Sequence, residues 1–252
     1  MINGKKVVAT IEGRMTSTRL PGKIMMLLAG KPVMAHMIER YRRSKLVDEV
    51  VVATTTNAAD DPIVALCEKM GCRYFRGSEQ DVFARVRQAG EAHGAEYLLQ
   101  GMADCPLVDP RHMDQCLELL LETDADVAGN EYPVTFPLGF NVRAYKFSTF
   151  RKAEQNDTDP TYREHAGYSI RSQPEKFKRV NWEAEGDMRW PELRLTLDTL
   201  EDYQLISAVY DELYSKNPDF SAEDIVRFLK MRPDLVSLNA GIKQKVPVVE
   251  TS

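Results

Sequence analysis

The chain has 252 residues, of which 43% are hydrophobic and 28% are charged, and its formal net charge is −5 at pH 7. This composition is typical of a globular protein and argues against a general nucleic-acid binder, which usually carries a basic face. No apolar run reaches membrane-spanning length and the N-terminus has no apolar signal core, so we expect a cytoplasmic protein without a membrane partner.

Strand-like and helix-like segments alternate through the first half of the chain. We expect strands at residues 6–12, 49–54, 73–76 and 97–102, and helices at residues 33–44, 60–70, 80–93 and 110–122. Asp60, Asp61 and Pro62 predict an acidic cap with proline in the first helical turn. This alternation predicts a mostly parallel sheet covered by helices on both faces.

The second half is less regular. We expect strands at residues 140–145, 177–181 and 194–197, helices at 147–155, 160–171 and 200–214, and a last helix that opens at the capping box 221–224 and stops before Pro233. There is no repeat and no long linker, so residues 1–252 are expected to form a single domain. Within it, residues 132–190 are a candidate sub-domain that closes over the sheet or pairs with a second subunit.

A basic loop follows the first expected strand. Arg14, Arg19 and Lys23 lie in it among small and hydroxyl residues that include Ser17. Its N–H groups and charges can surround one anion, and three cations suit a diphosphate or a triphosphate. The chain has no Gly-x-x-x-x-Gly-Lys-Ser/Thr motif, so this is not a P-loop. The alternative is a solvated surface loop with scattered charges.

Two aspartates follow expected strands: Asp104 after residues 97–102 and Asp198 after residues 194–197. Parallel sheets place ligands at the carboxyl ends of their strands, where a Mg²⁺ would relieve repulsion between aspartates and phosphates. Two such aspartates and a loop with three cations suit metal-assisted nucleotidyl transfer. The alternatives are a turn at Asp104 before Pro106 and a helix cap at Asp198.

The four cysteines and four histidines do not suggest another metal site. Cys67, Cys72, Cys105 and Cys116 form no Cys-x-x-Cys pair, and no histidine lies at zinc-finger spacing from them. We expect reduced thiols.

Residues 14–23 closely resemble the signature of the cytidylyltransferases that make CMP-activated sugar acids, and most closely the branch of spore coat polysaccharide biosynthesis protein F. Further matches lie at residues 60–63, 75–82, 103–107, 163–165 and 195–202, so the resemblance covers roughly residues 5–240. It implies a three-layer α/β/α Rossmann-like fold of the nucleotide-diphospho-sugar transferase type. It also implies CTP as donor, Mg²⁺ as cofactor and usually a homodimer.

The resemblance assigns roles to individual residues. It implies that Arg14, Lys23, Asp104 and Asp198 are catalytic and that the two aspartates hold the metal. The residues that it places at the nucleotide are Arg14, Ser17, Arg19, Lys23, Arg76, Gly77, Ser78, Asp81, Gln100 and Ala103. For residues 76–81 a purely structural role is equally consistent with the sequence.

The chain departs from the branch at two places. The branch usually reads Gln-Ala-Arg-x-Gly-Ser where this chain has Glu-Gly-Arg-Met-Thr-Ser at residues 12–17. It usually reads Pro-Asp-Gly-Leu-Asp-Val-Glu where residues 137–143 are Pro-Leu-Gly-Phe-Asn-Val-Arg. We therefore expect acceptor-binding residues at Asn141 and Arg143, with Arg163 and His165 as further donors, and an acceptor more anionic than usual. The alternative is that this expected strand is purely structural.

These features predict an enzyme that moves CMP from CTP onto a small anionic acceptor and releases pyrophosphate. A sugar acid, a phosphonate and a phosphorylated metabolite all fit, in the synthesis of a surface polysaccharide or a related conjugate. One alternative is a nucleotide-sugar-dependent glycosyltransferase with an Asp-x-Asp metal motif. Residues 124–126 have that spacing, but they begin a strand at the wrong end of a helix. The other alternative is a non-catalytic nucleotide-binding protein.

Overall fold

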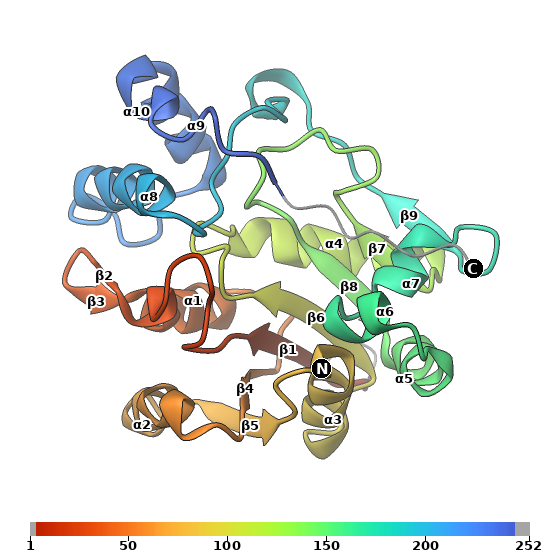
Figure 1. Ribbon diagram of the computed structural model, residues 1–252. Helices are drawn as coiled ribbons and strands as arrows, with labels where there is room; N and C mark the ends of the chain where they lie inside the picture. The colour runs from red at the N-terminus through yellow and green to blue at the C-terminus, as the bar shows by residue number, and fades with distance from the viewer. Residues whose placement is uncertain (1–3, 245–252) are drawn as a thin grey trace.

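The computed structural model describes residues 4–244, and Figure 1 shows a twisted sheet with helices on both of its faces. The strands in this range are β1 (Val7–Glu12), β2 (Leu27–Leu28), β3 (Lys31–Pro32), β4 (Glu49–Thr55), β5 (Arg73–Gly77), β6 (Tyr97–Met102), β7 (Val127–Gly129), β8 (Arg143–Lys146) and β9 (Arg179–Asn181). The α-helices are α1 (Val33–Arg42), α2 (Asp61–Lys69), α3 (Val82–Ala92), α4 (Pro110–Thr123), α5 (Phe147–Asn156), α6 (Pro160–Glu164), α7 (Tyr168–Ser172), α8 (Leu200–Leu213), α9 (Ala222–Lys230) and α10 (Pro233–Ser237).

The main sheet of the described residues has seven strands in the order β5-β4-β1-β6-β8-β7-β9. Strand β8 runs antiparallel to β6 and β7, and every other neighbouring pair is parallel. The predicted mostly parallel sheet is therefore confirmed. Strand β7 ends and β8 begins at the edge where β6 ends, because Gly129 and Gln100 both pair with Arg143. The short hairpin of β2 and β3 was not predicted.

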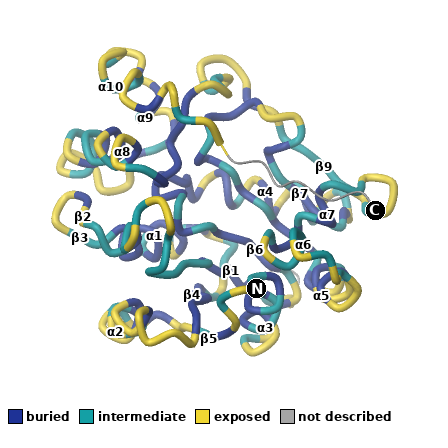
Figure 2. Tube along the Cα trace, viewed as in Figure 1, coloured by how far each residue is buried: buried dark blue, intermediate teal, exposed yellow. Residues whose placement is uncertain are grey.

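The central strands are apolar on both faces because helices cover both faces. Val7, Ala9 and Ile11 of β1 face one cluster, which includes residues of α1, α2, α4, α8 and α9. Val8 faces a second cluster, which includes residues of α3 and α5. Figure 2 shows the sheet strands mostly in dark blue, with yellow exposed residues concentrated on the outer helices and loops. The three-layer architecture expected from the sequence is confirmed.

Residues 194–197 do not form a strand of the sheet, so that prediction was wrong. Arg194 makes an isolated bridge to Leu138. The N–H groups of Leu195 and Leu197 each donate 2.7 Å hydrogen bonds, to the carbonyls of Leu138 and Asp104 respectively. Both carbonyls belong to loops at the carboxyl edge of β6 and β7. The extended segment therefore crosses this edge and pairs with loops, although its apolar alternation resembles that of a strand.

The predicted helix over residues 160–171 is broken into α6 and α7. Gly167 lies between them with a φ of 69°. A Cβ atom there would lie 2.6 Å from Oη of Tyr145, so glycine permits both the turn and the close approach. The range 132–190 includes β8 and β9, which are strands of the main sheet.

Candidate functional site

A buried aspartate fixes the start of the basic loop. Oδ1 of Asp60 accepts the backbone N–H of Met15 at 2.7 Å. Its Oδ2 accepts the hydroxyl of Thr54 at 3.0 Å and the N–H of Thr55 at 3.1 Å. Asp60 is the N-cap residue of α2 with Pro62 in the first turn, as predicted, but its side chain makes no cap hydrogen bond. Nothing in the neighbouring sequence indicates this contact, because Asp-Asp-Pro is an ordinary helix start.

The loops after β1 and β6 pack directly against each other. Ala103 donates its N–H to the carbonyl of Glu12 at 3.0 Å. A Cβ atom on Gly13 would lie 2.8 Å from the Cβ of Ala103, so only glycine fits at this crossing. Ala103, which we predicted at the nucleotide, is buried where the basic loop meets the loop that carries Asp104.

The two predicted metal-binding aspartates lie on neighbouring segments. The N–H of Leu197 donates a 2.7 Å hydrogen bond to the carbonyl of Asp104, which places the residue before Asp198 against Asp104. The Asp104 side chain is half-buried, and its Oδ1 accepts a long hydrogen bond of 3.4 Å from Sγ of Cys105. Its carboxylate therefore has little to hold it among the described residues.

Three cations surround Asp198. Nζ of Lys23 lies 2.8 Å and Nη2 of Arg19 lies 2.9 Å from Oδ1, while Nη2 of Arg194 lies 2.9 Å from Oδ2. Lys23 also donates to the carbonyl of Leu197 at 2.7 Å. Burial favours a raised pKa for Asp198, but the neighbouring cations outweigh it and the pKa is lowered. This carboxylate is therefore anionic at neutral pH.

The donor set at this edge fits a magnesium ion. Among residues 4–244 no group of three or more His, Cys, Asp and Glu side chains could hold a metal alone. Mg²⁺ is usually bound by one or two carboxylates and completes its shell with substrate phosphates and water. Asp104 and Asp198 supply two carboxylates of this kind. The site would therefore need the phosphates of a ligand to complete the coordination.

Arg14 points to a different partner from the other two cations of the basic loop. Its Nη1 lies 2.9 Å from Oε1 of Glu79, the acidic residue that also accepts the hydroxyl of Thr16. Ser17 is half-buried in the same loop. The loop thus brings Arg19 and Lys23 together at Asp198, while Arg14 links it to the segment after β5.

The predicted nucleotide residues after β5 have structural partners. Arg76 binds Asp61 at 2.7 Å and two backbone carbonyls, which ties β5 to the start of α2. A Cβ on Gly77 would lie 3.0 Å from Cγ of Arg85. Oγ of Ser78 accepts the N–H of Asp81 at 3.0 Å, and Asp81 caps α3.

Gln100 belongs to a buried chain of polar groups on the α3 side of the sheet. Its Nε2 donates to Oε1 of Glu12 at 3.2 Å and to the carbonyl of Ala166 at 3.1 Å. Its Oε1 accepts the hydroxyl of Tyr145 at 3.1 Å, and Arg171 donates to that hydroxyl. Burial raises the pKa of Glu12, although Arg85 and Arg143 oppose the shift.

The environment of Arg143 differs from the sequence-based expectation. Its Nη2 and Nε lie 2.6 and 2.7 Å from the two carboxylate oxygens of Glu131, so it forms a bidentate ion pair. Nε of Arg171 lies 3.6 Å from the same carboxylate. Glu131 therefore offsets the charge of Arg143, with Arg171 as a second cation beside the same carboxylate. Asn141 lies in the preceding loop, and its Oδ1 accepts the N–H of Gly139 at 2.9 Å.

Arg163 and His165, the two further donors expected from residues 160–171, differ in how many partners they have within the protein. Arg163 binds Asp81 at 2.9 Å and Glu154 at 2.7 Å, so it ties α6 to α3 and α5. His165 is half-buried, and its pKa is lowered by burial and by Arg171 and Arg143. It is therefore neutral at pH 7.

The Asp-x-Asp spacing at residues 124–126 lies at the opposite edge. Asp124 ends α4 with a φ of 51°. Asp126 accepts the N–H of Lys178 at 2.9 Å and the hydroxyl of Thr149 at 2.7 Å. These residues precede β7, far from the carboxyl edge where Asp104 lies. They give no support to the glycosyltransferase alternative.

The described residues contain no helix with both the length and the apolar character that a membrane crossing requires.

Comparisons with known proteins show the family and the fold of this chain. A family model described as cytidylyltransferase matches residues 8–238. Spore coat polysaccharide biosynthesis protein SpsF of Bacillus subtilis is 31% identical over 233 residues, which cover 90% of this chain and 95% of that protein. The structure of a cytidylyltransferase from Leptospira borgpetersenii has a TM-score of 0.87 at 30% identity and covers 96% of this chain and 99% of its own. A CMP:2-keto-3-deoxy-manno-octonic acid synthetase complexed with CTP shares the fold, with a TM-score of 0.63 at 18% identity over 82% of this chain and 99% of its own. The chain belongs to the cytidylyltransferase family.

Proposed function

We propose that this protein transfers CMP from CTP to a small anionic acceptor and releases pyrophosphate, with Mg²⁺ as cofactor. The observation that carries the proposal is the hydrogen bond between Leu197 and Asp104, which joins the two aspartate segments beside Lys23 and Arg19. Family membership supports nucleotidyl transfer from CTP as the reaction.

In this proposal Arg19, Lys23 and Arg14 hold the phosphates of CTP. Their positive charges offset the charge on the α-phosphate and on the departing pyrophosphate. Asp104 and Asp198 would hold Mg²⁺, which when bound supplies positive charge to the phosphate oxygens. Lys23 and Arg19 contact Asp198 directly, so the phosphate-binding cations and the metal-binding carboxylates of this proposal lie side by side at the carboxyl edge of the sheet.

The acceptor oxygen attacks the α-phosphorus in line with the bond to the β-phosphate. The new bond joins the acceptor to CMP, the proton of the acceptor hydroxyl passes to water, and the bond between the α-phosphorus and the bridging oxygen breaks so that pyrophosphate leaves with the bonding electrons. The protein acts mainly by positioning the reactants and by electrostatic stabilisation, so no covalent nucleophile is required.

The acceptor site in this proposal lies at the end of β6 and the start of β8, beside Asn141, Arg143 and His165. The sequence suggested an acceptor with extra negative charge, because Leu138, Asn141 and Arg143 stand where the branch carries carboxylates. Since Glu131 balances Arg143, we propose an ordinary small anion such as a sugar acid. The name of the Bacillus relative supports a role in a surface polysaccharide.

A pyrophosphate-release assay with each of the four nucleoside triphosphates and a panel of sugar acids tests this function. Release that requires both CTP and a sugar acid is expected, together with a CMP conjugate in the products. Equal use of all four nucleotides, or hydrolysis without a conjugate, would contradict the proposal. Light scattering on the purified protein tests the expected homodimer, and fractionation tests the expected cytoplasmic location.

A further inference from the structure

Asp202, at the start of α8, accepts several hydrogen bonds from buried groups next to the site. It has no exposed surface. Its Oδ1 accepts from Nε of Arg194 at 2.9 Å and from Nδ2 of Asn239 at 2.8 Å. Its Oδ2 accepts the N–H groups of Asp198 at 2.9 Å and Thr199 at 3.0 Å, and Nη2 of Arg194 at 3.1 Å. The carboxylate therefore has more partners than a helix cap needs.

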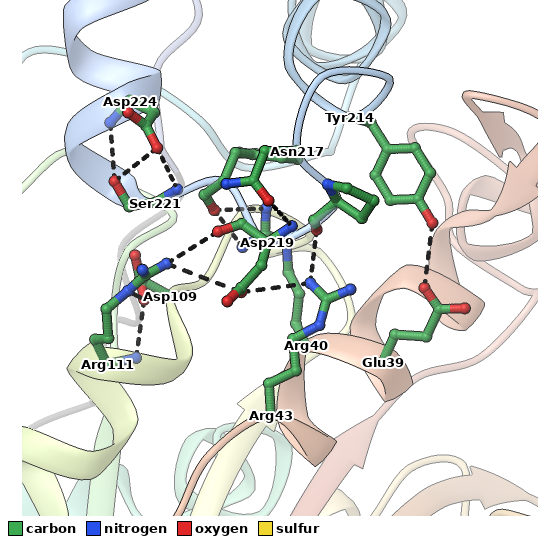
Figure 3. A network of polar contacts seen from close by, with 12 residues as sticks. Glu39, Arg40, Arg43, Asp109, Arg111, Tyr214, Asn217, Asp219, Ser221 and Asp224 are labelled. Atoms are coloured by element: carbon green, nitrogen blue, oxygen red, sulfur yellow. Dashed lines mark hydrogen bonds and ion pairs between the residues drawn. The ribbon is translucent and has the colours of Figure 1, made fainter.

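A second capping box in the same chain provides the comparison. Asp224 accepts the N–H of Ser221 at 3.0 Å at the start of α9, as Asp202 accepts the N–H of Thr199. Figure 3 shows Asp224 and Ser221 together near Arg111. Asp224 also pairs with Arg227, which is exposed. The capping role common to both aspartates does not explain the contacts of Asp202 to Arg194 and Asp198.

Arg194 connects this network to the carboxylate of Asp198. The same Nη2 that donates to Asp202 lies 2.9 Å from Oδ2 of Asp198, and Arg194 is only 5% exposed. Asp202 thus holds Asp198 at its backbone N–H directly and at Oδ2 through Arg194. The remaining oxygen, Oδ1, is the one that Lys23 and Arg19 contact.

We propose that Asp202 and Arg194 are positioning residues that hold Oδ2 of Asp198 and so turn its other oxygen, Oδ1, toward Lys23, Arg19 and the metal. This inference rests on the proposed function and extends it to residues that touch neither substrate nor metal. The negative charge of Asp202 balances Arg194, so the charge of Asp198 acts on Lys23, Arg19 and the metal at Oδ1. Without that balance, the Arg194 guanidinium would compete with the metal for Asp198.

The test compares three variants with the wild-type protein. Asp202→Asn keeps a cap acceptor but removes the charge that balances Arg194. Arg194→Lys keeps the charge but cannot bridge two carboxylates with a planar fork. Asp224→Asn is the matched control, since it makes the same change in the other capping box. Mn²⁺ binding is measured by electron paramagnetic resonance with a non-hydrolysable CTP analogue, and thermal unfolding and nucleotide binding in chelator are measured alongside.

We expect Mn²⁺ affinity to fall by about 10–100-fold in Asp202→Asn and Arg194→Lys, as for other groups that orient metal ligands. Asp224→Asn should bind Mn²⁺ like the wild type, and nucleotide binding in chelator should be unchanged in all three. If Asp202→Asn fails to fold, the Mn²⁺ affinity of Arg194→Lys alone tests the inference. Mn²⁺ affinities in the folded variants equal to that of Asp224→Asn overturn the inference. In that case CMP transfer by the wild type leaves the proposed function standing, whereas a wild type that neither binds Mn²⁺ nor transfers CMP overturns both.

Discussion

Asp60 accepts the backbone N–H of Met15 at 2.7 Å across 45 positions of the chain. This one contact fixes the first turn of the basic loop against the end of β4. Because Asp60 is fully buried and also receives groups of Thr54 and Thr55, it is held rigidly itself. The loop that carries Arg19 and Lys23 therefore starts from a fixed point.

Asp60→Asn should raise the Michaelis constant for CTP, because the amide is a weaker acceptor for Met15 and the loop loses its fixed start. Loss of a hydrogen bond to a charged group costs about 1.5–3 kcal/mol. Asp114→Asn is a suitable control, since Asp114 holds the N–H groups of Lys45 and Leu46 in another loop. Asp114→Asn should lower the free energy of unfolding without changing the Michaelis constant for CTP. An equal effect of both variants on CTP kinetics would contradict this role of Asp60.

Asp104→Asn should reduce turnover by orders of magnitude and leave thermal unfolding unchanged. Among residues 4–244 the side chain makes only a 3.4 Å contact with Cys105, so its removal costs the fold little, whereas a metal prefers an anionic oxygen. Turnover at saturating Mg²⁺ and the unfolding midpoint measure the two effects separately. Activity close to that of the wild type would remove Asp104 from the metal site.

Arg143→Met should destabilise the protein by about 3–5 kcal/mol, because it removes the bidentate partner of the buried Glu131 and leaves it only the longer contact with Arg171. The exposed pair of Arg189 and Glu183 offers the control, and Arg189→Met should change stability by only about 0–1 kcal/mol. Urea unfolding of both variants and the wild type measures the change in the free energy of unfolding. If the two variants have the same free energy of unfolding, water or Arg171 stabilises the Glu131 carboxylate sufficiently without Arg143, and the prediction is contradicted.

Glu12→Gln should stabilise the protein at neutral pH. The pKa of Glu12 is raised in the folded state, so folding favours its protonated form and stability falls as the pH rises through that raised pKa. The variant lacks this loss, and the carbonyl oxygen of the introduced amide can still accept from Gln100. Unfolding curves between pH 4 and 8 should therefore diverge as the pH rises and converge toward the ordinary pKa of glutamate. A constant difference at every pH would contradict the assignment.

The central strands are predictable because their signal is local. Val50, Val51 and Val52 form a continuous apolar run, which marks a strand buried on both faces. Asp104, Asp198 and Lys23 are likewise proposed from short motifs. The partners of Arg143 and Met15 are not predictable in this way, because Glu131 and Asp60 reach them through tertiary packing. The strand prediction for residues 194–197 was wrong because an extended segment that bonds to loops shows the same alternation of apolar and polar residues as a strand in a sheet.

The reversed direction of β8 has a consequence for how this fold can change its specificity. Residues 130–142 leave the sheet at the end of β7 and re-enter it at the start of β8, so both anchor points lie on the ligand side. A replacement must keep the core residues Phe136 and Phe140 and the pairing of Leu138 with Leu195, but it need not move a strand or a crossover helix. Exchange of this one loop between relatives that keep these anchors should therefore change acceptor preference and leave the basic loop of residues 14–23 unaltered.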